Sequence, residues 1–380
     1  MGKTPTEILD VAYLRALEED QIISNSEILT KLNYICKESH NRSGVRVLLA
    51  CSLAKIHDSN KDIRKPYTEI GDDDVYSGRS YDEKYITAFI DKHNLPCNNT
   101  TAWLTPAWRN HENLLTPSVI PVGTPKNMYK FVIELLDNIH SGVVTAEDLL
   151  AQVVHILLAV RDDRQLEMDR LLSQLNVRDT DDIIPLSTED IVTILEQHLE
   201  SKGASRLPVL AIAAAYNAAH EYLHEKILPL ESHNAADKQT GSLGDLEVTM
   251  LDDDGVITSY EMKAKRVTEN DINHALTKID ETGTRIDNYI FITTDVIDVE
   301  VLEYAKSIYD KTGGIEVAIL DCVSFIRYFL HLFHRIRLHY LDAYQELLMQ
   351  EPDSAVSDAL KRVFLNLRIN AEGTYTNNNL

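Results

Sequence analysis

The stretch that most constrains the fold of this 380-residue chain lies at positions 244–263. A turn centred on Asp254-Gly255 is flanked there by the apolar residues Val248, Met250, Val256 and Ile257. An Asp-Gly pair between two runs that contain apolar residues favours a tight β-hairpin. The sequence therefore predicts two antiparallel strands, with residue 245 near the open end of the first strand and residues 261–263 at the open end of the second.

Three charged side chains gather at this open end. Side chains on a strand alternate between its two faces, so Glu261 and Lys263 share a face, and the hairpin brings Asp245 beside them. This set suits metal-assisted hydrolysis of a phosphodiester, because Mg²⁺ is held by one or two carboxylates, water and phosphate oxygens. The cation lowers the pKa of a bound water. A neighbouring lysine can orient that water or stabilise charge that develops on the phosphate.

An acidic-x-Lys triplet is common by chance, and the chain has three, which end at Lys84, Lys202 and Lys263. The first two lie in stretches of helical periodicity, and no Gly-Asp strand precedes them. Only the third has the context of strand, turn and strand. An exposed hairpin with solvated charges is the simpler interpretation, but the surroundings favour the catalytic one.

The composition limits the class of protein. A chain of 380 residues with 44% hydrophobic residues can form two or three domains with a sizeable core. The N-terminus has no apolar signal region, and no apolar run reaches the length of a membrane span. The four cysteines lie far apart and lack zinc-site spacing, which is typical of reduced thiols in the cytosol: Cys36, Cys51, Cys97 and Cys322. We expect a soluble, cytoplasmic protein without a membrane partner.

The formal net charge of −23 argues against a general DNA coat, because DNA binders usually carry a basic surface. The charge is unevenly distributed. Residues 40–110 hold ten basic and nine acidic side chains, whereas the remainder holds 27 basic and 51 acidic ones. A locally basic groove on an acidic body is compatible with DNA binding, and the acidic excess limits sequence-independent attachment to phosphates.

The first two hundred residues show mostly helical periodicity, interrupted by a long polar loop at residues 58–78. The best domain boundary is the segment Ser201 to Ser205, after which the pattern becomes mixed. Beyond the boundary we expect a helix at 209–228, the hairpin, a helix at 268–280 capped by Thr268, a buried strand at 289–292, a helix at 299–308, a buried strand at 317–320 and a long helix at 322–348.

This order predicts an α+β or α/β fold, in which a helical N-terminal domain precedes a mixed sheet flanked by helices. We assign residues 1–204 to a helical domain for DNA recognition and dimerisation, residues 205–350 to the catalytic domain, and residues 351–380 to a C-terminal extension.

The set Asp245, Glu261 and Lys263 resembles the signature of the PD-(D/E)XK nuclease superfamily, and the expected order of elements matches its core. Three segments of the N-terminal half resemble SacI-like restriction endonucleases: residues 64–71, 76–83 and 95–110. This resemblance covers most of residues 40–110 and 210–295.

The resemblance implies a type II restriction enzyme that depends on Mg²⁺, acts on double-stranded DNA and reads a palindrome as a homodimer, with a cognate DNA methyltransferase as genetic partner. Carried over to this sequence, Asp245 and Glu261 are metal ligands and Lys263 is the water-positioning base. The backbone carbonyl of Met262 is expected to complete the metal shell.

Several accessory residues have two interpretations. Glu247 shares a strand face with Asp245 and either binds a second metal or meets solvent. Glu221 and Glu225 lie one turn apart on the expected helix before the hairpin, where a solvated helix face is the commoner outcome. Lys265 after the second strand and Gln239 before the first could contact phosphate.

For the reading of bases, an arginine fork suits guanine and an asparagine suits adenine. The loop-rich N-terminal stretch offers such residues, although each is more often a phosphate contact or part of a structural ion pair: Arg42, Arg79, Asn98, Arg109 and Asn110. Arg79 and Arg109 are the strongest single candidates.

Two other functions remain open. One is a repair or modification-dependent nuclease of the same superfamily, which would cut damaged or modified DNA. The other is a non-catalytic DNA-binding protein with a decayed site, against which the intact Asp245, Glu261 and Lys263 argue.

Overall fold

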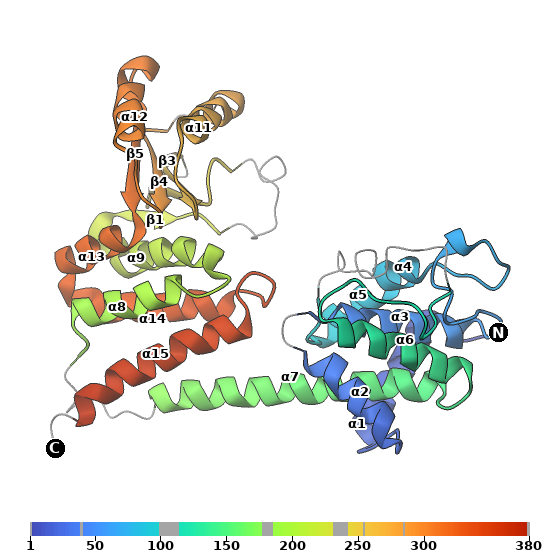
Figure 1. Cartoon of the computed structure of the whole chain (residues 1–380). Helices are drawn as coiled ribbons and strands as arrows, with labels where there is room; N and C mark the ends of the chain where they lie inside the picture. Colours follow the sequence, from blue (N-terminus) through green and yellow to red (C-terminus); the bar gives the residue numbers. More distant parts are fainter. Residues whose placement is uncertain are drawn as a thin grey trace. The chain divides into compact units, whose positions relative to one another are not determined.

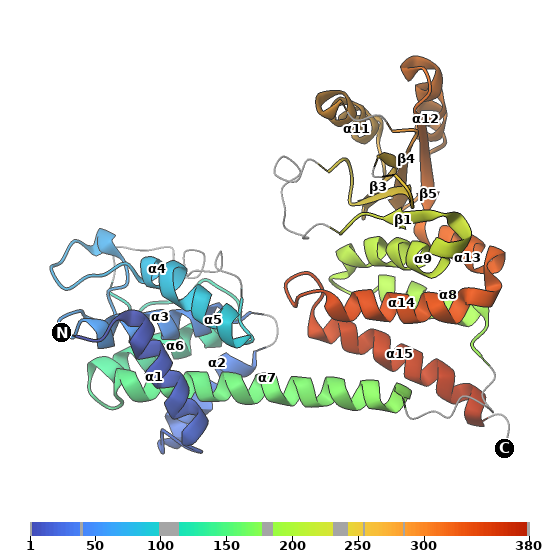
Figure 2. The same cartoon turned by 180° about the vertical axis from the view of Figure 1, so that it is seen from behind.

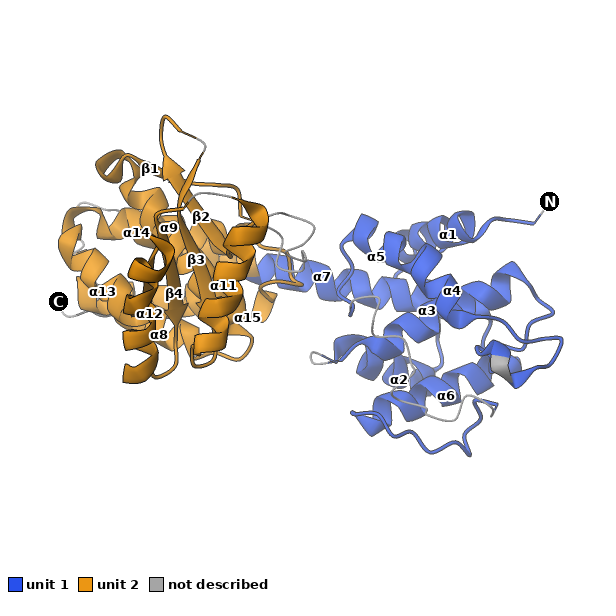
Figure 3. Ribbon diagram, turned by 90° about the horizontal axis from the view of Figure 1, so that it is seen from above, with its two compact units in different colours: residues 1–167 blue, residues 168–380 orange. Residues whose placement is uncertain are grey.

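The structure, a computed structural model, describes residues 2–38, 41–98, 114–176, 185–230, 242–253, 255–283 and 286–377 (Figure 1). The chain forms two compact units, residues 1–167 and residues 168–380 (Figure 3). The division falls inside helix α7 (Ala146–Asn176) rather than at residue 204. Helix α8 (Thr188–Leu199), which the sequence analysis places in the N-terminal domain, therefore belongs to the second unit.

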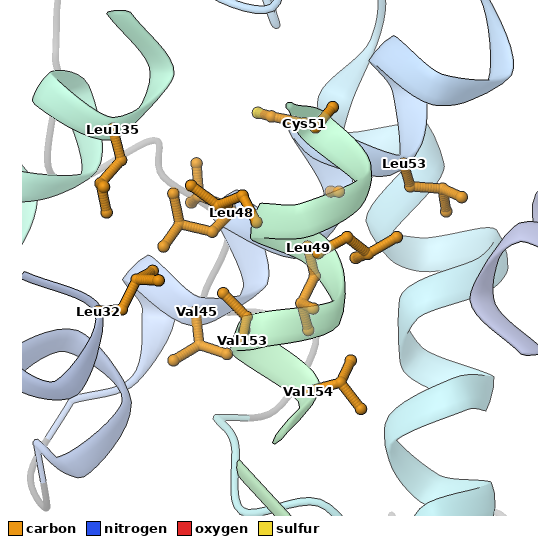
Figure 4. Close-up of a cluster of buried hydrophobic side chains, with 14 of the residues drawn as sticks. Leu32, Val45, Leu48, Leu49, Cys51, Leu53, Leu135, Val153 and Val154 are labelled. Atoms are coloured by element: carbon orange, nitrogen blue, oxygen red, sulfur yellow. The ribbon is translucent and has the colours of Figure 1, made fainter. Parts of the chain in front are cut away.

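Unit 1 is built around helix α3 (Ser43–His57), in which every residue from Ser43 to Ala54 is buried. A helix that is buried on all sides lies in the core, covered by the segments around it. Side chains of α3 and α7 interdigitate in this core (Figure 4). The surrounding elements are α1 (Pro5–Glu18), α2 (Ser26–Lys37), η1 (Thr68–Ile70), α4 (Gly78–Tyr81), η2 (Asp82–Ile86), α5 (Thr87–His93) and α6 (Lys126–His140).

Unit 2 contains a five-stranded mixed sheet in the order β1-β2-β3-β4-β5. The pairs β1–β2 and β2–β3 are antiparallel, and the pairs β3–β4 and β4–β5 are parallel. This arrangement confirms the predicted hairpin and both buried strands. The strands are β1 (Glu225–Ile227), β2 (Leu246–Met250), β3 (Val256–Lys263), β4 (Asn288–Thr293) and β5 (Glu316–Asp321).

The two faces of the sheet pack against different helices (Figure 1 and Figure 2). Leu246, Tyr260 and Ile292 point to the face covered by α9 (Leu207–Leu223), α13 (Cys322–Leu332) and α14 (Arg337–Gln350). Tyr289 and Phe291 point to the opposite face, which α11 (Glu269–Thr282) and α12 (Val299–Thr312) cover. The strand alternation thus supplies two separate apolar cores.

The structure corrects two expected elements. The helix predicted at 209–228 ends at Leu223, where His224 adopts a left-handed conformation with φ of 55°, and Glu225 then begins strand β1. The long helix predicted at 322–348 is two helices separated by a 3-10 turn at His334–Ile336.

The predicted C-terminal extension is part of unit 2. Its helix α15 (Asp358–Asn377) places Leu360 and Phe364 in the core. Within the described residues, no helix is long and apolar enough to cross a membrane.

Candidate active site

The position of Asp245 depends on the glycine before it. A Cβ atom at Gly244 would lie 2.4 Å from the carbonyl oxygen of Tyr260 on β3, which is too close for any side chain. Glycine lets the two backbones approach here. The Asp245 N–H then donates to the Tyr260 carbonyl at 2.8 Å, next to the Leu246–Tyr260 pair of the strand register. Asp245 is thereby fixed at the open end of the hairpin.

The exposed side chain of Asp245 is bonded to the opposite strand. Its Oδ2 accepts the backbone N–H of Met262 at 2.7 Å. In an extended strand the N–H and the C=O of one residue point towards the same neighbour. The Met262 carbonyl therefore faces the side on which Asp245 lies.

Glu261 lies on the same sheet face. The Tyr289 hydroxyl on the neighbouring strand lies 3.4 Å from Glu261 Oε2, but the shorter hydrogen bond of this hydroxyl is to the Leu243 carbonyl at 3.0 Å. Burial raises the pKa of Glu261, and the negative charge of Asp245 raises it further. The positive charges of Lys263 and Lys278 oppose this rise. The two carboxylates are thus close enough to repel each other, and a bound cation would relieve that repulsion.

Lys263 lies between two carboxylates. Its Nζ is 3.1 Å from Glu261 Oε1 and 3.3 Å from Asp271 Oδ1. Burial lowers the pKa of Lys263, but the charges and hydrogen bonds of Glu261 and Asp271 outweigh it, so that the net change is a rise. Lys263 is therefore an ammonium ion at neutral pH, which fits a role in orienting water and stabilising charge better than a role as proton acceptor.

Asp271 is the one member of this group that the sequence analysis does not single out. It is the third residue of α11 and forms a capping box with Thr268. The available signal was the Thr-x-x-Asp pattern directly after the second hairpin strand, which predicts a helix start. Nothing in that pattern indicates that the same carboxylate reaches Lys263.

Two accessory residues of the sequence analysis, Glu247 and Lys265, lie near Asp245 and the end of β3. Glu247 lies beside Asp245, but its Oε1 accepts the Leu243 N–H at 2.6 Å. Both acids line an open pocket of about 190 Å³ together with Leu228, Pro229, Ser242 and Leu246. Lys265 is exposed just after β3.

Glu221 and Glu225 are not brought to the carboxylate pair. Glu221 is exposed on α9, which covers the opposite face of the sheet, and Glu225 lies on β1 opposite Met250. Gln239 is outside the described residues.

The predicted DNA-reading residues of unit 1 differ in accessibility. Arg42 is only 7% exposed and donates from Nε to the Cys36 carbonyl at 3.1 Å. Asn98 Oδ1 accepts the backbone N–H of Arg42 at 2.8 Å. Arg79 is well exposed and pairs with Glu83 at 2.7 Å, one helical turn away. Arg109 and Asn110 lie outside the described residues.

The described residues contain no group of three or more His, Cys, Asp or Glu side chains placed to hold a metal ion by themselves. Mg²⁺ does not require such a cage, because it keeps several waters and is commonly bound through one or two carboxylates and substrate phosphate. Asp245, Glu261 and the Met262 carbonyl fit that smaller set.

The fold and the site define unit 2 as an α+β domain with a carboxylate pair and a lysine at the open end of a hairpin. Residues 185–294 match the family model of the SacI restriction endonuclease C-terminal domain. The match contains every described residue of the site and confirms the resemblance to SacI-like restriction endonucleases. It does not extend to residues 40–110. No curated protein matches the chain.

Proposed function

We propose that this protein is a type II restriction endonuclease, which hydrolyses phosphodiester bonds of double-stranded DNA at a specific short sequence with Mg²⁺ as cofactor. One observation carries the proposal. Asp245, Glu261 and Lys263 lie together on one sheet face inside a domain that matches a restriction-endonuclease family.

In this proposal Asp245 and Glu261 hold the cation, with the Met262 carbonyl as a further ligand. A bound Mg²⁺ would polarise the phosphate and acidify a water. The chain itself supplies the remaining functions. The Met262 N–H fixes one Asp245 oxygen at 2.7 Å. The Lys263 ammonium is placed to orient the attacking water and to stabilise negative charge on the phosphate.

For recognition we propose that the near-neutral region of residues 40–110 faces DNA, because it avoids the acidic excess of the rest of the chain. Among the described residues, exposed Arg79 is the best candidate for a base or phosphate contact. Lys265, exposed beside the site, is a candidate for a phosphate contact. A homodimer would match a palindromic sequence, because two-fold symmetry of the protein mirrors that of the DNA.

The test is digestion of unmethylated phage DNA by the purified protein with Mg²⁺. We expect discrete fragments from the wild type, whereas Asp245→Ala and Lys263→Ala should cut at least ~10³-fold more slowly, the scale of a lost electrostatic contact in a catalytic site. Both variants should still bind DNA. Glu346→Gln, on α14 across the sheet, is the control and should cut normally.

Ca²⁺ should support binding without cleavage, because it takes the same oxygen ligands with looser geometry. Cleavage at full rate in excess chelator, or wild-type fragments from either alanine variant, would contradict the proposal. Parallel digestion of methylated DNA separates a restriction enzyme from a modification-dependent nuclease.

A further inference from the structure

The carboxylate of Asp271 makes different contacts with its two oxygens. Oδ2 accepts the Thr268 N–H at 2.9 Å and the Thr268 hydroxyl at 2.6 Å, which closes the capping box of α11. Oδ1 lies 3.3 Å from Nζ of Lys263 on β3. One side chain therefore joins the first turn of α11 to the lysine of the site.

The contact with Lys263 is additional to the capping interaction. Helix α8 begins with the same capping box, in which Asp190 Oδ2 accepts the Ser187 N–H at 2.9 Å. Helix α8 packs on the other face of the sheet, away from Lys263. A capping box therefore forms in this unit without a contact to Lys263. The contact of Asp271 Oδ1 with Lys263 is thus one that helix capping does not require.

The surroundings make Asp271 a firm anchor. Its backbone is fixed in the first turn of a 14-residue helix, and Val267, directly before the N-cap residue Thr268, is 3% exposed in the core beneath α11. The Asp271 side chain is itself only partly exposed, at 27%. An anchor of this kind restricts the rotamers of the lysine that it contacts.

The charges explain why such an anchor is useful. Lys263 contacts Glu261 and Asp271, and Glu261 is the carboxylate that a divalent cation would also use. A cation at Glu261 competes with the ammonium for the same oxygens and repels it. Asp271 is then the remaining partner that keeps Lys263 beside the site.

We propose that Asp271 is a positioning residue, which holds the Lys263 ammonium in place when Glu261 binds a divalent cation and offsets the repulsion between the two positive charges. This inference rests on the proposed function. Asp271 touches neither substrate nor cation and acts only through Lys263.

The test variant is Asp271→Asn, which keeps the size of the side chain and an oxygen for the cap but removes the charge. Asp190→Asn makes the same change in the capping box of α8. Thr268→Ala weakens the capping box of α11 and leaves the Asp271 carboxylate intact. Asp271→Glu retains the charge and a residue type that suits this position of a capping box.

Three quantities are measured: Mn²⁺ affinity by calorimetry without DNA, DNA affinity in Ca²⁺, and the single-turnover cleavage rate at saturating DNA and Mn²⁺. We expect Asp271→Asn to lower Mn²⁺ affinity about fivefold, because the Lys263 ammonium then repels the cation without a carboxylate to offset it. The cleavage rate should fall ~10- to 100-fold, as for a displaced catalytic group. DNA affinity in Ca²⁺ should stay unchanged. Asp190→Asn and Thr268→Ala should resemble the wild type in all three quantities, and Asp271→Glu should recover most of the rate.

A double-mutant cycle separates positioning from folding. In a Lys263→Met background there is no ammonium to offset, so Asp271→Asn should change Mn²⁺ affinity much less than it does in the wild type. An equal loss in both backgrounds, or a loss of rate in Thr268→Ala as large as in Asp271→Asn, would overturn the inference and leave the proposed function standing. A wild-type protein that neither binds Mn²⁺ nor cuts DNA would overturn both.

Discussion

Each of the two units contains an ion pair, but the two pairs are built differently: one joins two helical elements, whereas the other lies within strand β3. In unit 1, Arg46 and Asp82 have side chains that are 2% and 0% exposed, and Arg46 Nε lies 2.9 Å from Asp82 Oδ1. The other guanidinium nitrogens of Arg46 donate to the Asn98 carbonyl at 2.9 Å and the Thr87 hydroxyl at 2.7 Å. In unit 2, Lys263 and Glu261 are 29% and 23% exposed.

The difference separates charges that hold a fold together from charges that can serve chemistry. A buried pair tolerates the loss of water only when its hydrogen bonds are satisfied within the protein, and Arg46 meets this condition. The group at Lys263 has an acidic excess, with Asp245, Glu261 and Asp271 against the ammonium ions of Lys263 and Lys278. An added cation would balance such a group, whereas it would only disrupt the pair in unit 1.

The largest effect on stability is therefore expected in unit 1. Asp82→Ala leaves the Arg46 guanidinium buried without its carboxylate, and we expect this to lower the free energy of unfolding of unit 1 by about 3–5 kcal/mol. Chemical denaturation followed by circular dichroism measures the change. Asp245→Ala removes a carboxylate from the open site and should alter stability by less than ~1 kcal/mol. Equal losses from the two variants would remove the distinction between the sites.

His198 extends the comparison to a closed polar group within unit 2. It is fully buried between two helices, where its Nε2–H donates to the Leu360 carbonyl at 3.0 Å. Its Nδ1 then accepts the Tyr344 hydroxyl at 2.9 Å. The neutral ring satisfies both contacts, and burial disfavours the charged ring, which lowers the pKa of His198 to about 4.

The pH dependence follows from this lowered pKa. The unfolded chain takes up a proton on His198 near its ordinary pKa of ~6.5, whereas the folded protein resists until about pH 4. The stabilisation is therefore complete above pH 6.5 and is lost as pH falls towards 4, by roughly 2–4 kcal/mol. Between about pH 4 and 6.5 the free energy of unfolding should therefore depend less steeply on pH in His198→Gln than in the wild type. An unchanged slope in that variant would contradict the assignment.

Arg79 and Arg42 test the same distinction for DNA recognition. If exposed Arg79 contacts a base, Arg79→Ala should weaken binding of the cognate site by about 1–3 kcal/mol and relax the choice at one position. Arg42→Ala should instead lower the melting temperature, because its side chain is buried against the Cys36 carbonyl. Cleavage of substrates with every single-base change, at two salt concentrations, distinguishes base from phosphate contacts.

Glu83→Gln is the control, since it breaks the ion pair but leaves the Arg79 side chain in place. Unaltered affinity and selectivity in Arg79→Ala would move the recognition role to other residues of the chain.

The parts of the fold that the sequence predicted have strong local signals. The Asp-Gly turn between runs containing apolar residues predicted the hairpin, and Thr268 marked the start of α11. Strand β1 escaped prediction because its three residues follow an Ala-rich helix without a glycine or proline, and the break is a left-handed His224. The apolar periodicity of residues 322–348 likewise hides the turn at His334–Ile336.

The site was predictable only in part, for a related reason. Asp245, Glu261 and Lys263 belong to one hairpin, so strand alternation is enough to bring them together. The contact of Asp271 with Lys263 depends on how α11 packs against β3, which no local pattern specifies. The burial of Arg42 similarly depends on residues distant in sequence, such as Asn98.

The smallest expected effect concerns the charge of the open site itself. Asp245 is exposed, and in the absence of a cation its carboxylate would repel an approaching DNA phosphate. Asp245→Asn removes this repulsion and can still accept the Met262 N–H, so it should bind cognate DNA in chelator more tightly than the wild type, by about 1 kcal/mol or less. Fluorescence anisotropy at low salt measures the difference. Glu346→Gln removes one charge across the sheet and should leave affinity unchanged, so an equal gain in both variants would assign the effect to net charge rather than to the site.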